Sequence, residues 1–183
     1  MIEKIYIENY KIFESFTLEC NDELNIIVGD NETGKSTILE AIGMAFTKRI
    51  NGRQLEAELS PYFFNKNCVE NYFKLAKTGK NPELPKVIIE LYLSEDEKLA
   101  ALRGTNNTQK ENCIGVKLEI VFNEDYTAEY AELFEDINNM KVIPSEYYKV
   151  CWYSFANNPI TGRILPIGIS YIDATVIRLQ SGT

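Results

Sequence analysis

The chain reads Gly29-Asp30-Asn31-Glu32-Thr33-Gly34-Lys35-Ser36 directly after the apolar run from Leu24 to Val28. Beyond Ser36 the apolar residues repeat with helical spacing, so the predicted order of elements is strand, glycine-containing loop and helix. The spacing G-x-x-x-x-G-K-[ST] in this context predicts a loop that binds phosphate groups. An ordinary glycine-rich turn is the alternative, but it leaves the Gly-Lys-Ser-Thr run unexplained.

Each residue type in this loop suits a particular contact with a nucleoside triphosphate. Gly29 and Gly34 allow backbone angles at which successive N–H groups turn inward around a phosphate, reinforced by the start of the following helix. Lys35 would reach the β- and γ-phosphates, and the Ser36 hydroxyl would ligate Mg²⁺. The expected ATP-binding residues are Gly29, Asp30, Asn31, Glu32, Thr33, Gly34, Lys35, Ser36 and Thr37.

Composition sets the broad class of the protein. The chain has 183 residues, of which 45% are hydrophobic, which suffices for the core of one domain. No stretch approaches the roughly 20 apolar residues of a membrane span, and the N-terminus lacks a leader pattern, so we expect a cytoplasmic protein. The four cysteines form no C-x-x-C pair and histidine is absent, which argues against zinc and favours reduced packing cysteines.

Charge is distributed unevenly along the chain. The formal net charge is −8, yet the segment 48–86 has eight basic and four acidic residues and is therefore locally +4. One interpretation is a solvated insertion that its lysines keep soluble, and the other is a surface that faces DNA. We expect residues 50–85 to be an insertion.

Hydrophobic periodicity predicts the remaining elements. Strands are expected at 4–8, 16–19 and 24–28, and a helix from about Ser36 to Lys48. An amphipathic segment follows at 67–77. Later strands are expected at 86–93, 114–122, 126–134 and 167–174, with a short helix at 95–102 and a hairpin turn at 123–125. The aromatic residues between Tyr147 and Phe155 are expected in the core.

Two motifs together resemble a known group of ATPases. The segment from Ile7 to Phe13 fits I-x-N-[FY]-[RK]-x-[FY], and the loop continues as G-x-N-x-x-G-K-[ST] with an apolar helix start. This combination resembles the N-terminal region of the ABC-type ATPases of the RecF, SMC and OLD (overcoming lysogenization defect) families, and we identify it with OLD-type ATP-dependent endonucleases. Asn31 matches the loop asparagine of these families. Lys11 matches a basic residue near the phosphates, although a solvated turn lysine is the alternative.

The resemblance implies an α/β P-loop NTPase fold, with a mixed sheet and antiparallel strands. Residues 1–183 would form a single N-terminal lobe of a longer protein that binds ATP and Mg²⁺, dimerises through the complete protein and acts on DNA. The catalytic residues stay unknown, because neither 87–90 nor 120–125 is a convincing second acidic motif and no Ser-Gly-Gly-Gln-type signature occurs. A self-contained small kinase or GTPase and a non-catalytic, nucleotide-dependent interaction module are the alternatives.

Overall fold

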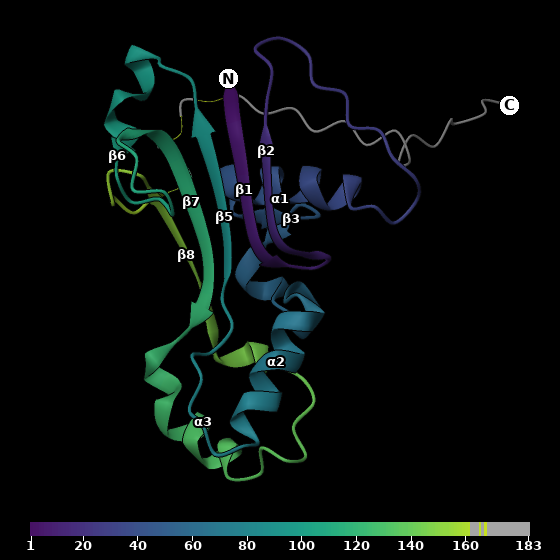
Figure 1. Ribbon diagram of the computed structural model, residues 1–183. Coiled ribbons are helices and arrows are strands. Elements are labelled where there is room, and N and C mark those ends of the chain that lie inside the picture. The colour runs from purple at the N-terminus through teal and green to yellow at the C-terminus, as the bar shows by residue number, and fades with distance from the viewer. Residues whose placement is uncertain (162–164, 166, 168–183) are drawn as a thin grey trace, which may run out of the picture.

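A six-stranded antiparallel sheet forms the framework of the computed structural model, which describes residues 1–161, 165 and 167 (Figure 1). Strands β2, β1, β5 and β7 are neighbours in that order, and β6 and β8 both pair with β7. The strands are β1 (Ile2–Tyr10), β2 (Phe13–Glu19), β5 (Val87–Leu93), β6 (Arg103–Gly104), β7 (Cys113–Phe122) and β8 (Tyr148–Ser154). All pairings in the described part of the sheet are antiparallel, so the parallel component of the expected mixed sheet does not occur there.

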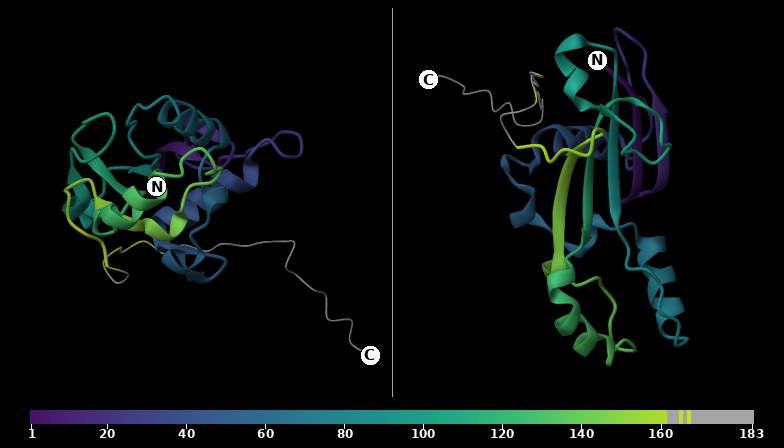
Figure 2. Two further views of the ribbon diagram at one scale, coloured as in Figure 1. Left: turned by 90° about the horizontal axis from the view of Figure 1, so that it is seen from below. Right: turned by 90° about the vertical axis from the view of Figure 1, so that its left-hand side faces the viewer.

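Helix α1 (Lys35–Thr47) crosses one face of the sheet (Figures 1 and 2). Its buried side chains include Ile38 and Met44, which join the core cluster formed with the inward residues of β1, β5 and β7. The indole nitrogen of Trp152 in β8 donates a buried hydrogen bond of 2.7 Å to the carbonyl oxygen of Ala45. This bond fixes the position of α1 relative to β8.

Helices α2 (Lys66–Ala76) and α3 (Thr127–Phe134) project together beyond one end of the sheet (Figures 1 and 2). Aromatic side chains join them: the hydroxyls of Tyr72 and Tyr130 contact each other, and the rings of Phe122 and Tyr130 meet edge to face with centroids 5.3 Å apart. Such pairs favour one relative placement of the rings they join. The pair α2–α3 is thereby anchored to the end of β7.

Shorter elements connect these parts. They are β3 (Arg49–Ile50) and β4 (Arg53–Gln54), which pair with each other, and the 3₁₀ helices Leu55–Glu58, Pro61–Phe63, Glu97–Leu102, Glu124–Tyr126 and Ser145–Tyr147. None of the helices in the described ranges is long and apolar enough to cross a membrane.

Most predicted elements are confirmed. The helix expected from about Ser36 to Lys48 is α1, the amphipathic segment 67–77 is α2, and the strands expected at 86–93 and 114–122 are β5 and β7. Of the aromatic residues expected in the core, Tyr148, Trp152 and Phe155 are buried, whereas Tyr147 and Tyr153 are only partly buried. All four cysteines are unpaired and partly buried. The strand expected at 167–174 falls almost entirely outside the described residues.

The prediction of a strand at 126–134, paired through a hairpin with β7, is wrong. Thr127–Phe134 of this segment is α3, and the next strand along the chain that pairs with β7 is β8. The aromatic residues Tyr126, Tyr130 and Phe134 recur every four positions, which is a helical period, and alanine and glutamate between them favour a helix. Residues 123–125 therefore lead into a helix rather than a hairpin.

The strand expected at 24–28 is also absent. Residues 20–30 have no regular structure, and Leu24, Ile26 and Val28 are 71%, 74% and 83% exposed. A strand requires a neighbour for its backbone N–H and C=O groups, and no described strand pairs with this segment. Its alternating apolar side chains therefore face solvent.

Candidate nucleotide-binding site

The glycine loop 29–36 leads directly into the first turn of α1. The first helical hydrogen bond runs from the Ile38 N–H to the Gly34 carbonyl, at 2.9 Å. The N–H groups of Lys35, Ser36 and Thr37 are therefore not used within the helix, and they carry the positive end of its dipole. This is the arrangement that binds an anion at the start of a helix.

The side chain of Lys35 folds back onto the loop that precedes it. Its ammonium donates to the carbonyl oxygens of Gly29, at 2.6 Å, and of Asp30. The Thr33 hydroxyl donates to the same Asp30 oxygen, at 2.9 Å. Backbone carbonyls rather than a carboxylate thus hold the ammonium, so no ion pair has to be broken before it contacts a phosphate.

Gly34 is required by both backbone and space. Its φ of 92° lies in the left-handed region, which costs a residue with a side chain about 1 kcal/mol or more. A Cβ at this position would lie 2.4 Å from the Ile12 side chain and 2.6 Å from the ring of Phe13. The two-residue turn between β1 and β2 consequently packs directly against the glycine loop.

The same turn carries Lys11, the basic residue expected near the phosphates. Its ammonium forms an ion pair with the carboxylate of Glu40 on α1, and the buried Tyr10 hydroxyl donates to that carboxylate as well. Burial, followed by the bond to Glu40, raises the pKa of Tyr10 well above its ordinary value, so the hydroxyl stays protonated as a donor. Glu40 lies one helical turn beyond Ser36, so Lys11 is held beside the start of α1.

Asn65 joins this turn to α2. Its side-chain oxygen caps the helix by accepting from the N–H groups of Asn67 and Cys68, at 3.0 and 3.2 Å. Its side-chain amide donates to the Lys11 carbonyl at 2.9 Å, and its backbone N–H donates to the Asn9 carbonyl at 2.9 Å. One residue, 5% exposed, therefore connects the Lys11 turn with the N-terminus of α2.

The roles of Glu40 and Asn65 were not predicted from the sequence. The signal for Glu40 was its four-residue spacing from Ser36, which places both residues on one face of a helix. The signal for Asn65 was an asparagine immediately before an amphipathic segment, the usual place of an N-cap. The partners Tyr10 and Lys11 could not be found from spacing, because they lie on a distant strand and turn.

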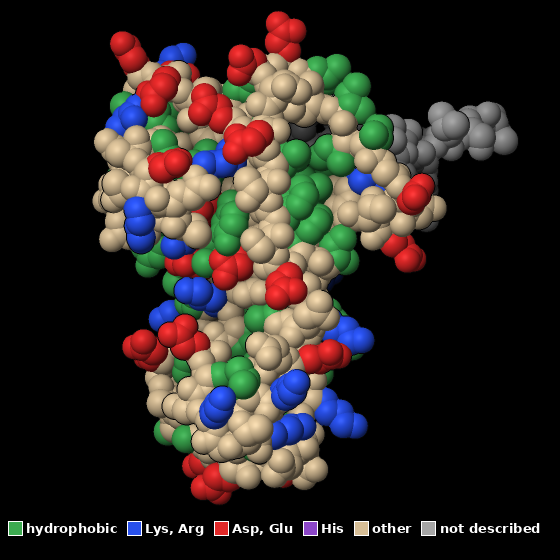
Figure 3. Space-filling view, viewed as in Figure 1, with side chains coloured by type: hydrophobic (Ala, Val, Ile, Leu, Met, Phe, Trp, Pro, Cys, Tyr) green, Lys and Arg blue, Asp and Glu red, His purple; other side chains and the backbone are tan. Residues whose placement is uncertain are grey.

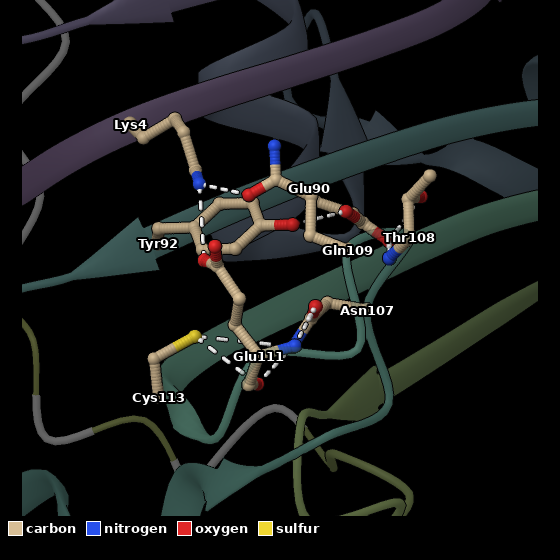
Figure 4. A network of polar contacts seen from close by, with 8 residues as sticks. All are labelled: Lys4, Glu90, Tyr92, Asn107, Thr108, Gln109, Glu111 and Cys113. Carbon is tan, nitrogen blue, oxygen red and sulfur yellow. Dashed lines mark hydrogen bonds and ion pairs between the residues drawn. The ribbon is translucent and has the colours of Figure 1, made fainter.

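The acidic residues considered for a second motif have other surroundings. Glu90 lies in the middle of β5 with no exposed surface, and its two carboxylate oxygens accept from the Tyr92 hydroxyl, at 2.8 Å, and from the N–H and hydroxyl of Thr108, at 2.8 and 2.9 Å (Figure 4). Lys4 contacts Gln109 and Glu111 of the same loop and lies 4.0 Å from the Tyr92 ring centre. This network holds the loop 105–112 on the sheet.

Two further features lie near α1. A pocket of about 550 Å³ is found at the opposite end of this helix from the glycine loop, lined in part by Phe46, Lys48 and Trp152. Within the described residues, no group of three or more histidine, cysteine, aspartate or glutamate side chains could hold a metal ion. A cation at Ser36 would take its other ligands from phosphate oxygens and water, as Mg²⁺ commonly does beside a nucleotide.

Comparison with known proteins gives the family. Residues 4–152 match the model of the AAA domain family AAA_23. Over 109 residues the chain is 32% identical to structural maintenance of chromosomes protein 6A of Arabidopsis thaliana. The aligned region covers 56% of the chain and 10% of the relative. Over 121 residues the chain is 26% identical to the DNA replication and repair protein RecF of Bacillus thuringiensis, and this alignment covers 66% of the chain and 30% of the relative.

A third relative matches a shorter region. Over 41 residues the chain is 42% identical to RecF of Staphylococcus haemolyticus, and this alignment covers 22% of the chain and 11% of that protein. The chain thus spans about a tenth to three tenths of the length of these relatives. The family match covers most of the chain, so the chain belongs to the AAA_23 family of AAA domains and is related to the SMC and RecF proteins.

Proposed function

We propose that this chain is the MgATP-binding lobe of an OLD-type ATPase and endonuclease that acts in DNA metabolism or defence. The observation that carries the proposal is the glycine loop at the start of α1, with the Lys35 ammonium resting on two loop carbonyls. The names of the relatives, which include a DNA replication and repair protein and a chromosome maintenance protein, support an action on DNA. The OLD assignment rests on the two sequence motifs.

Binding would use groups of the glycine loop and of the first turn of α1. The N–H groups of residues 35–37 would receive phosphate oxygens, and the Lys35 ammonium would exchange its carbonyl partners for the β- and γ-phosphates. The Ser36 hydroxyl, exposed in the first turn of α1, would ligate Mg²⁺, which supplies charge neutralisation on the phosphates. Lys11 is held on Glu40 beside this turn and would add a second positive charge on exchanging this ion pair for a phosphate oxygen.

Hydrolysis would need a carboxylate that the acids considered above do not supply within the described residues. Activation of water requires a carboxylate near the γ-phosphate. Of the acids considered above, Glu90 is committed to Tyr92 and Thr108. We infer that the remaining groups come from another segment or from the partner lobe of a homodimer, and that residues 1–183 are one lobe of a longer protein with an insertion at 50–85.

Binding and turnover of MgATP test the proposal. Lys35→Ala should weaken ATP binding about tenfold to a hundredfold, since a hydrogen bond to a charged group contributes about 1.5–3 kcal/mol. Lys98→Ala, an exposed lysine after β5, is the matched control and should leave the affinity unchanged. Equal affinity in the parent chain and Lys35→Ala would refute the site. Turnover by the chain alone would show that its hydrolytic acid lies within these residues, as in a self-contained enzyme.

A further inference from the structure

The exposed side of α2 carries a stripe of lysines. Lys66 and Lys74 in α2 and Lys77 at its C-cap follow at intervals that keep them on one side of the helix, with Glu70 between them, and Tyr72, Phe73 and Ala76 are buried on the adjoining side. Lys80 follows after the turn at Gly79 and is also exposed. We name these four lysines the α2 lysine stripe, and Figure 3 shows basic side chains gathered over this helix.

Most of this positive charge is not balanced locally. Lys66 forms an exposed ion pair with Glu70 at 3.6 Å, whereas the ion pairs of the described residues do not include Lys74, Lys77 or Lys80. Residues 66–86 contain five lysines and two glutamates, a local charge of +3 in a chain whose net charge is −8. The rest of the chain therefore carries −11, and the stripe is a positive surface on an acidic protein.

The neighbouring helix has the opposite charge. Residues 124–136, which contain α3, carry six acidic residues and no basic one. Because α2 and α3 are joined through Tyr72 and Tyr130, the projecting pair has one basic and one acidic side. Electrostatic attraction therefore favours the approach of a polyanion from the side of α2.

The shape of the surface favours an extended polyanion over a small one. The lysines lie on the outside of a helix rather than in a pocket, and Lys66 to Lys77 spans about 16 Å at a rise of about 1.5 Å per residue. Duplex DNA presents about one phosphate charge per 1.7 Å of its axis, so several lysines can be neutralised at once. Lysine is a mobile point charge that contacts phosphates and reads no base sequence.

We propose that the α2 lysine stripe binds the phosphate backbone of duplex DNA without sequence preference. The choice of DNA rests on the proposed function, whereas the location of the surface rests on the charges and exposure of α2. Asn65 links this helix to the turn that carries Lys11, so the DNA surface and the nucleotide site share a hydrogen-bonded connection.

The test compares two triple variants of the full chain. One is Lys74→Gln, Lys77→Gln and Lys80→Gln. The control is Lys98→Gln, Lys110→Gln and Lys149→Gln, which removes the same charge from exposed positions outside α2. Binding of a fluorescent 30-base-pair duplex of arbitrary sequence is measured from 50 to 300 mM salt. ATP affinity is measured on the same samples.

The stripe variant should bind at least tenfold more weakly at 0.1 M salt, and the slope of log affinity against log salt should fall by about 2 to 3. The control should change affinity less than threefold. Equal loss in both variants, or no DNA binding by the parent chain, would overturn the proposal. So would unchanged DNA binding with a salt-dependent change in oligomer mass, which would mean that the stripe pairs with acidic α3 of a second copy. Failure of ATP binding alone would refute the nucleotide site and leave the DNA surface standing.

Discussion

Replacing Asn65 by alanine should lower the free energy of unfolding by about 2–4 kcal/mol. Loss of the N-cap to α2 typically costs about 1 kcal/mol. Loss of the amide donor leaves the Lys11 carbonyl without its partner, which costs a further 1–3 kcal/mol at a poorly solvated site. In a chain of this length, each kcal/mol shifts Tm by roughly 2–4 °C, so the expected drop is about 4–16 °C.

Two companion variants separate these contributions. Asn65→Asp keeps the capping oxygen but removes the amide donor, so it should retain the cap and still lose about 1–3 kcal/mol. Asn67→Ala changes an exposed residue in the first turn of α2 and is the control, with an expected change below about 0.5 kcal/mol. Urea unfolding followed by circular dichroism gives the free energies, and ATP titration shows whether the Lys11 turn is disturbed.

The reasoning fails if Asn65→Ala lies within 0.5 kcal/mol of the parent chain. It also fails in part if Asn65→Asp is as stable as the parent, because the bond to the Lys11 carbonyl would then contribute nothing. A loss of ATP affinity in Asn65→Ala that Asn67→Ala does not show would mean that the hydrogen bonds of Asn65 affect nucleotide binding.

Two further predictions concern buried hydroxyl groups. Glu40→Ala leaves the Tyr10 hydroxyl without its carboxylate acceptor and should destabilise the chain by about 1–3 kcal/mol. Glu40→Gln keeps an acceptor and should cost less than about 1 kcal/mol. Equal losses in urea unfolding would contradict this account of Tyr10. The Tyr148 hydroxyl is buried with no hydrogen-bond partner in the described structure. Tyr148→Phe should therefore leave Tm unchanged or raise it by a few degrees. A fall in Tm of more than about 4 °C would mean that this hydroxyl makes a stabilising hydrogen bond.

The periodicity of apolar residues was sufficient to predict the elements that bury one regular face against the rest of the fold. In β7, Val116, Leu118 and Ile120 alternate with Lys117 and Glu119, and the predicted strand matches the observed one within a residue. Helix α1 was equally predictable from the sequence, because its apolar spacing follows directly on the glycine loop. These predictions needed only local information.

The failures mark places where distant parts of the chain decide the structure. The run 24–28 has the composition of a strand, but a strand forms only where another strand pairs with it. The segment 126–134 differs, because the four-residue spacing of its aromatics was a local helical signal; contacts of Tyr130 with Phe122 and Tyr72 stabilise the helix further. Within the site, the loop was evident from spacing, whereas the joining of Lys11 to Glu40 and Asn65 depends on the tertiary fold.

The hydrogen bond between Trp152 and Ala45 also gives the chain its own spectroscopic probe. Trp152 is the single tryptophan of the sequence, is 6% exposed, and contacts the backbone of the helix that the glycine loop begins. Its fluorescence arises from one site, so emission that shifts to longer wavelength reports water reaching the back of α1. Nucleotide titrations and unfolding can therefore be followed without a label, from the same residue and at the same helix.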